Sequence, residues 1–233
     1  MNNWENDLNK RTSAGAMGDK VPEEILDWLK SIISKTKDKK ILDFTNNLAG
    51  NLKEEYLIFM RPTQSNKNRQ GLVKSDDMNF LNYQKYIDSL CFNLFFKKFW
   101  KSINILSENR PLQIDSSWVN FQKKYEYNTM HDHCGLFSWV IFVNIPYDLE
   151  EEEKCFATGG TTTTTSKFFF AYPSNSSYFK SSIKTSVLNV DKSYEGKIII
   201  FPAHTLHGVN PFYTSDEYRI TVSGNLRYQV DKI

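Results

Sequence analysis

The spacing of apolar residues along the chain changes near Pro111. Before this point, from about Val21, apolar residues recur every three or four positions, which is typical of helices with one buried face. Beyond it, short apolar runs alternate with turn residues, which is typical of β-strands. Helices followed by an all-β block predict a mainly β fold, a jelly roll in which N-terminal helices support one sheet.

The first helix is predicted to begin near Pro22, because proline suits the first helical turn. Glu23 and Glu24 then lie at the N-terminal end, where acidic side chains interact favourably with the helix dipole. The apolar face of this helix comprises Ile25, Trp28, Leu29, Ile32 and Ile33.

A longer helix is predicted over residues 79–105, and a weaker one over 43–48. We interpret the apolar stripe of the longer helix as a face packed on a sheet, with a cofactor site as the minor alternative. Residues 61–77 are polar and predict an irregular loop. The stripe consists of Phe80, Tyr83, Ile87, Leu90, Leu94, Phe95, Phe99 and Trp100.

About eight short strands are predicted in the second half of the chain, at the spacing of a sandwich or barrel. They cover residues 113–122, 125–131, 138–145, 168–172, 185–190, 197–201, 207–209 and 218–226.

Residues 148–166 combine an acidic run with a glycine- and threonine-rich run. We interpret the acidic run as the solvent-exposed end of a hairpin, and the threonine run as a candidate strand extension. The alternative is a mobile lid over a substrate, because long loops beside a site are often functional.

Length and composition favour one domain over residues 1–233, with 40% hydrophobic and 15% aromatic residues. Its predicted parts are a flexible arm at 1–20, a helical support region at 21–110 and a jelly-roll core at 111–228. A net charge of +2 gives no indication of a nucleic-acid or membrane partner. The N-terminus lacks a signal-peptide core, and three widely spaced cysteines make no disulfide framework, so we expect a cytoplasmic protein.

All four histidines lie in two segments, 130–133 and 201–207. His131 and His133 are expected to share one face of a strand, because side chains alternate along strands. His207 follows a distant apolar strand, so the three side chains can meet at one metal. Oxygen-using enzymes commonly hold Fe(II) with three ligands on one face, so we predict an iron centre.

Several alternatives to this ligand set stay open. Asp132 could replace His133 if the strand is irregular, and Cys134 could indicate a structural zinc site, although zinc prefers paired spacings. His204 precedes His207 by three residues and is expected to lie near the metal or face the substrate. The four histidines could also be ordinary polar residues.

The motifs of the β-block resemble those of the prolyl-hydroxylase-like superfamily of 2-oxoglutarate/Fe(II) oxygenases, closest to a branch frequent in bacteria and marine phages. The resemblance covers residues 111–228 and implies a double-stranded β-helix, with the host cytoplasm as location if the protein is phage-encoded. The motifs that carry it are Trp118-Val119-Asn120, His131-x-His133, Ser138, the Gly196–Pro202 strand, His207-x-Val209-x-Pro211 and Arg219-x-Thr221-x-Ser223-x-Asn225.

The resemblance implies roles for individual residues. His131, His133 and His207 would hold iron, with His133 at the position of the family's aspartate, which leaves the site more positive. Arg219 would grip the distal carboxylate of 2-oxoglutarate, for which its planar fork is suited. Further cofactor-binding residues would be Thr221, Ser223, Asn225, Asn120 and Tyr127, while Trp118, Trp139 and Phe201 would form core or pocket wall.

The resemblance implies an Fe(II)/2-oxoglutarate-dependent dioxygenase that uses O₂ to hydroxylate a small molecule or a prolyl or other residue of a peptide. A cupin-type three-histidine iron dioxygenase is the second hypothesis, although no glutamate follows His133 at the usual short distance. A non-catalytic jelly roll used for binding is the third.

Overall fold

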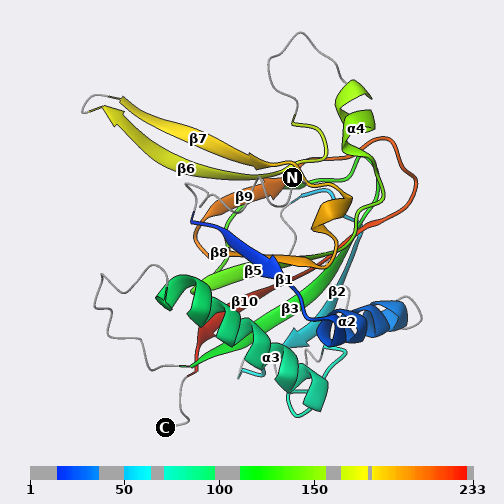
Figure 1. Ribbon diagram of the computed structural model, residues 1–233, viewed down its shortest axis with the longest axis vertical. Helices are drawn as coiled ribbons and strands as arrows, with labels where there is room; N and C mark the ends of the chain where they lie inside the picture. The colour runs from blue at the N-terminus through cyan, green and yellow to red at the C-terminus, as the bar shows by residue number, and fades with distance from the viewer. Residues whose placement is uncertain are drawn as a thin grey trace.

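The computed structural model describes residues 15–36, 50–63, 71–97, 111–155, 164–177 and 180–229. Two antiparallel sheets face each other, and two helices cover the outer face of the larger sheet (Figure 1). The expected mainly β jelly roll with supporting helices is thereby confirmed.

The larger sheet has six strands in the order β1-β8-β5-β10-β3-β2. The smaller has four, in the order β4-β9-β6-β7. The first sheet comprises β1 (Met17–Lys20), β2 (Glu54–Met60), β3 (Leu112–Gln122), β5 (Phe137–Asn144), β8 (Lys197–Pro202) and β10 (Arg219–Tyr228). The second comprises β4 (Asn128–His131), β6 (Phe168–Ser177), β7 (Lys180–Leu188) and β9 (Leu206–Val209).

Strand β8 explains how the core divides into two layers. Ile198 and Ile200 pack on the helix side, whereas Ile199 and Phe201 pack between the sheets. Because side chains alternate along a strand, a continuous apolar run is buried on both faces. This places the larger sheet between a helical layer and the smaller sheet.

The helical layer consists of α2 (Glu23–Thr36) and α3 (Met78–Cys91), which continues into the π-helical turn η2 (Phe92–Lys97). The predicted packing of the aromatic stripe is confirmed for its described part, since Phe80, Tyr83, Ile87, Leu90 and Leu94 are buried. The side chain of Phe95, residues 99 and 100 and the helix expected at 43–48 lie outside the described residues.

A hydrogen bond joins α3 to the larger sheet, because the indole Nε1 of Trp139 donates to the Tyr83 hydroxyl over 2.8 Å. The indole also requires glycine at position 224. A Cβ atom there would come within 2.2 Å of Trp139 Cζ2, far inside van der Waals contact.

Two boundaries of the predicted support region are wrong. The arm assigned to residues 1–20 ends in a strand, since β1 pairs with β8 and covers its edge. The helical region assigned to 21–110 contains β2, which pairs with β3. Both strands depend on partners far along the chain, so a local helical pattern could not reveal them.

The acidic run is helical and not the solvated end of a hairpin, which corrects the prediction. It forms α4 (Leu149–Cys155), and the Glu152 side chain is fully buried. Its carboxylate accepts hydrogen bonds from the backbone N–H groups of Tyr213 and Thr214, at 2.9 and 2.7 Å. The predicted threonine-run strand and lid fall largely outside the described residues.

A short 3₁₀ turn, η4 (Lys192–Tyr194), leads into β8. Among the described helices, none has the length and apolar character needed to cross a membrane.

Candidate functional site

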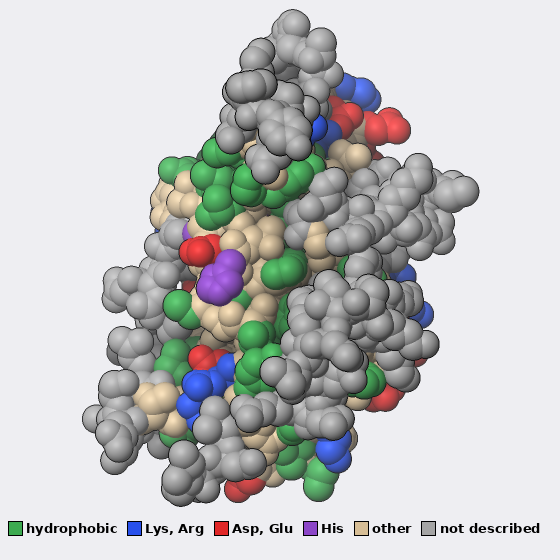
Figure 2. Space-filling model, turned by 90° about the vertical axis from the view of Figure 1, so that its left-hand side faces the viewer, with side chains coloured by type: hydrophobic (Ala, Val, Ile, Leu, Met, Phe, Trp, Pro, Cys, Tyr) green, Lys and Arg blue, Asp and Glu red, His purple; other side chains and the backbone are tan. Residues whose placement is uncertain are grey.

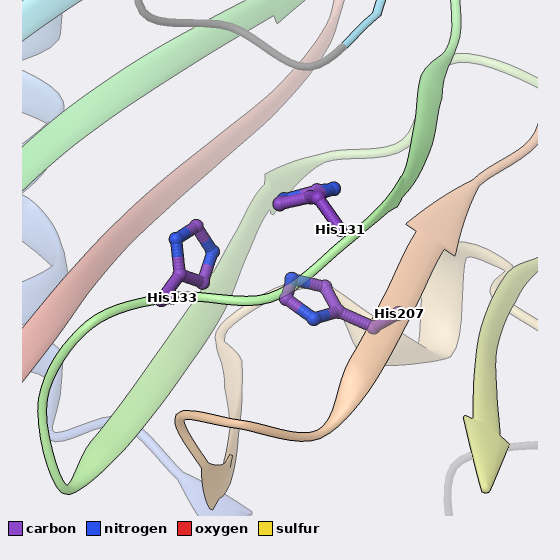
Figure 3. Close-up of side chains that lie close together, drawn as sticks. All are labelled: His131, His133 and His207. Atoms are coloured by element: carbon purple, nitrogen blue, oxygen red, sulfur yellow. The ribbon is translucent and has the colours of Figure 1, made fainter.

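Three imidazoles converge between the two sheets (Figure 3). His131 is the last residue of β4, and His207 lies opposite it on β9. One ligand atom from each of His131, His133 and His207 lies within 4.8 Å of the others. Within the described ranges, this is the one group of three or more metal-ligating side chains.

His133 reaches the group from a loop, which corrects the expectation that it shares a strand with His131. β4 ends at His131, so side-chain alternation does not orient His133. Its backbone N–H donates instead to Ala203 O over 2.9 Å, which ties the loop to the turn between β8 and β9. The Trp118 ring lies 5.5 Å from the His133 ring and supports its position.

Backbone carbonyls fix the tautomers of two imidazoles. Nδ1 of His131 lies 2.6 Å from Thr129 O, and Nδ1 of His207 lies 2.9 Å from Thr205 O. A carbonyl oxygen can only accept, so each Nδ1 must carry the proton. Each Nε2 therefore keeps a free lone pair, as metal-binding histidines require.

The surroundings keep the imidazoles of His133 and His207 neutral. Burial, followed by the neighbouring His131 and His133, lowers the pKa of His207 to about 3. Burial, followed by His131, lowers the pKa of His133 to about 4. A metal therefore has no proton to displace at these two residues near neutral pH, so the group fits a divalent metal ion.

The alternative ligands do not join the group. Asp132, Cys134 and His204 are all exposed, and none belongs to the group of three. The structure therefore favours His133 over Asp132 as third ligand, and gives no support to a zinc site at Cys134. Figure 2 shows a face where a histidine side chain reaches the surface beside an acidic one.

The three histidines border a pocket that lies between the two sheets. One part of its wall is apolar and the other carries amides, hydroxyls and Arg219, but no carboxylate. Its other lining residues are Leu52, Trp118, Asn120, Gln122, Asn128, Trp139, Val140, Phe142, Phe168, Val190, Phe201, Val209, Thr221 and Ser223.

Arg219 is 3% exposed and is held by neutral acceptors alone. Its guanidinium donates to Gln122 Oε1 at 2.7 and 3.1 Å and to the Tyr147 hydroxyl at 3.0 Å. It also donates to the carbonyl oxygens of Ser166 at 2.7 Å and Asn210 at 2.9 Å. No ion pair joins it to another described residue, so its buried charge is uncompensated by direct contact.

Three more of the predicted cofactor-binding residues line the pocket. Nδ2 of Asn120 lies 3.4 Å from both the Thr221 and the Ser223 hydroxyls. Its Oδ1 atom is buried and has no partner among the described residues. These polar groups are only weakly engaged, so they can bind a ligand.

Two of the predicted cofactor-binding residues, Tyr127 and Asn225, do not line the pocket. Tyr127 is 42% exposed and does not line the pocket, because it precedes β4 and points outward. Asn225 accepts a hydrogen bond of 2.8 Å from Ser138 and also lies outside the lining. Sequence reasoning missed Gln122, which lies at the end of a predicted strand and pairs with Arg219 in the structure. It also missed Tyr147, Ser166 and Asn210, which lie outside the predicted strands.

Comparisons with known proteins agree with this geometry. Residues 116–225 match the family model described as "Putative 2OG-Fe(II) oxygenase". No curated protein matches the chain significantly.

Two solved structures share the fold at low sequence identity. A Pseudomonas putida prolyl-4-hydroxylase is 9% identical, with a TM-score of 0.52 over 97% of this chain and 98% of that one. The non-haem alpha-ketoglutarate-dependent epimerase SnoN from nogalamycin biosynthesis is 12% identical, with a TM-score of 0.53 over 96% of this chain and 80% of that one. Over residues 116–225 this chain is therefore similar to the 2OG-Fe(II) oxygenase family, whose members are enzymes.

Proposed function

We propose that this protein is a 2-oxoglutarate-dependent oxygenase in which His131, His133 and His207 hold Fe(II). The observation that carries this proposal is that three converging imidazoles and one guanidinium without an ion-pair partner lie on the same pocket. The imidazoles suit a divalent metal, and the guanidinium suits an anionic co-substrate.

The metal, 2-oxoglutarate and O₂ supply the oxidation, which couples decarboxylation of the co-substrate to hydroxylation of a C–H bond. The chain supplies position, charge and exclusion of water. Phe168 lies nearly parallel to His207, at 13° and 5.7 Å, and the Phe201 ring lies 4.7 Å from the imidazole at 60°. These rings fix the imidazole and keep that side of the pocket dry.

Arg219 would attract the distal carboxylate of 2-oxoglutarate. Of its present acceptors only Gln122 lines the pocket. A carboxylate is a stronger acceptor than a neutral amide, so it would replace Gln122 as partner of the guanidinium fork. Thr221 is the next residue on the pocket face of β10 and can donate its hydroxyl to the same carboxylate.

For the primary substrate we propose an amino-acid residue of a peptide, such as proline, or a small molecule. The support is analogy with the Pseudomonas putida prolyl-4-hydroxylase, which shares the fold. A cytoplasmic location and a relation to phage enzymes are further proposals, based on cysteine usage and motif resemblance respectively.

The test is to add 2-oxoglutarate to the anaerobic Fe(II)-loaded protein and record the visible iron-to-ligand charge-transfer band. We expect a band in the parent, a much weaker one in Arg219→Ala and an unchanged one in Arg227→Ala. Arg227 is the matched control, because it lies on the same strand, is half-buried and pairs with Asp115 away from the pocket.

The all-histidine set of ligands keeps a second candidate, a three-histidine dioxygenase that needs no 2-oxoglutarate. Bound iron without a charge-transfer band would select that candidate. Failure to bind iron would contradict both and favour a non-catalytic binding protein.

A further inference from the structure

Charge in the pocket is of one sign. Among the residues that line it, Arg219 is the one with a permanent charge, and no Asp or Glu is present. The nearest acidic neighbour of the histidines in sequence, Asp132, is exposed and lies outside the group.

Buried carboxylates elsewhere in the fold do not reach the ligand space. Glu152 is committed to the backbone N–H groups of Tyr213 and Thr214. Glu126 accepts from the N–H of Lys123. Glu55 on β2 pairs with Asn120 on the neighbouring strand β3, but it does not line the pocket. A bound ligand therefore contacts positive and neutral groups only.

The identity of residue 133 sets the net charge of the site once a divalent metal is bound. With a carboxylate ligand, a divalent metal, that carboxylate and Arg219 carry two positive charges in total, which a dianion such as 2-oxoglutarate neutralises. With the neutral His133 as ligand, the divalent metal and Arg219 carry three positive charges in total. One positive charge is therefore left after the 2-oxoglutarate dianion has bound. An uncompensated charge in a buried site is costly, so a further anion stabilises the complex.

We propose that the primary substrate presents an anionic group to this pocket, and that His133 is the residue that creates the requirement. The proposal rests on the proposed function, since it takes the histidines as metal ligands. Groups able to receive the anion are present: Asn120 Nδ2 donates to the Ser223 hydroxyl over only 3.4 Å, so this amide and the hydroxyl that accepts from it can both donate to an anion instead.

The test uses acetate and acetamide, which have nearly the same shape but differ by one negative charge. Each is titrated into the anaerobic Co(II)-loaded protein saturated with 2-oxoglutarate, and binding is read from the visible cobalt spectrum. We expect the parent to bind acetate at least about tenfold more tightly than acetamide, because the interaction is screened little in a buried site.

The decisive comparison is His133→Asp, which restores a carboxylate ligand and should abolish the preference for acetate. His204→Asp is the matched control, because it makes the same change at an exposed histidine outside the group of three. This control should keep the preference of the parent.

Equal binding of acetate and acetamide by the parent would overturn the proposal, and this outcome can be read even if His133→Asp fails to bind cobalt. Retention of the full preference in cobalt-loaded His133→Asp would overturn it as well. If 2-oxoglutarate leaves the cobalt spectrum unchanged, the proposed function is wrong. If 2-oxoglutarate does change the spectrum but acetate and acetamide bind equally, the proposed function stands and the charge proposal alone is wrong.

Discussion

At the scale of single residues, the site depends on how each imidazole is oriented. His131 and His207 each use Nδ1 to donate to the carbonyl of the residue two positions earlier. The backbone of β4 and of the turn before β9 thus selects the nitrogen that is left for a metal. His133 is oriented differently, through the backbone of its loop and the Trp118 ring.

Replacing either strand-borne histidine should remove the metal. We expect His131→Ala and His207→Ala to lower Co(II) affinity by at least about tenfold, since three protein ligands are the minimum of such a site. The measurement is isothermal titration of the apo protein with cobalt. His204→Ala serves as control and should bind like the parent, whereas an equal loss there would contradict the assignment.

At the scale of elements, the helix α4 holds the loop between β9 and β10. Glu152 accepts from the N–H groups of Tyr213 and Thr214, and Phe212 from the same loop packs on Tyr147 at 5.2 Å. The Phe212 ring also lies 5.5 Å from the Arg219 guanidinium. The acidic helix α4, which the sequence predicts to be solvent-exposed, therefore supports the loop that packs against Arg219.

Glu152→Ala should lower the free energy of unfolding by about 2–3 kcal/mol, because it leaves buried N–H donors without an acceptor. Urea denaturation followed by fluorescence measures this loss. Glu151→Ala, an exposed position on the same helix, should change stability by no more than about 0.5 kcal/mol. Equal effects of the two substitutions would show that Glu152 does not hold the loop.

The contact between α3 and the larger sheet offers a second test at this scale. Tyr83→Phe removes the acceptor for Trp139 Nε1 in a buried site and should cost about 1–2 kcal/mol of stability. Tyr86, one turn away, donates to Lys20 O over 3.3 Å at a more exposed place. Tyr86→Phe should therefore cost about 0.5 kcal/mol or less by the same urea measurement.

At the scale of the whole molecule, the site spans both sheets. His131 and His207 come from the smaller sheet, whereas Arg219, Asn120 and Thr221 come from the larger one. A ligand that contacts metal and Arg219 together therefore joins the two layers of the fold.

The Co(II)-loaded protein should consequently be stabilised more by 2-oxoglutarate than by 2-oxobutyrate, which lacks the distal carboxylate. At a concentration about a hundredfold above the dissociation constant, 2-oxoglutarate should add about 2.7 kcal/mol. For a chain of this size that corresponds to a melting temperature about 5–10 °C higher in a thermal scan. Equal shifts for the two acids would exclude Arg219 as the carboxylate anchor.

The sequence alone determined the β-strands of the core and the candidate residues of the site. Each predicted strand from 113–122 to 218–226 has a counterpart among β3 to β10, because the apolar runs and turn residues are local signals. His131 and His207 could be predicted as candidates for a similar reason, since each lies on such a strand, whereas the role predicted for Arg219 follows from the family resemblance.

Only the tertiary structure decided how these parts meet. β1 and β2 form because distant strands present them with partners, and the neutral acceptors of Arg219 come from four separate segments. His133 enters the site from a loop held by Ala203, and Tyr127 turns outward, although both lie close to β4 in sequence. Local periodicity reports which face of an element is buried, but contacts between elements fix where a loop residue points.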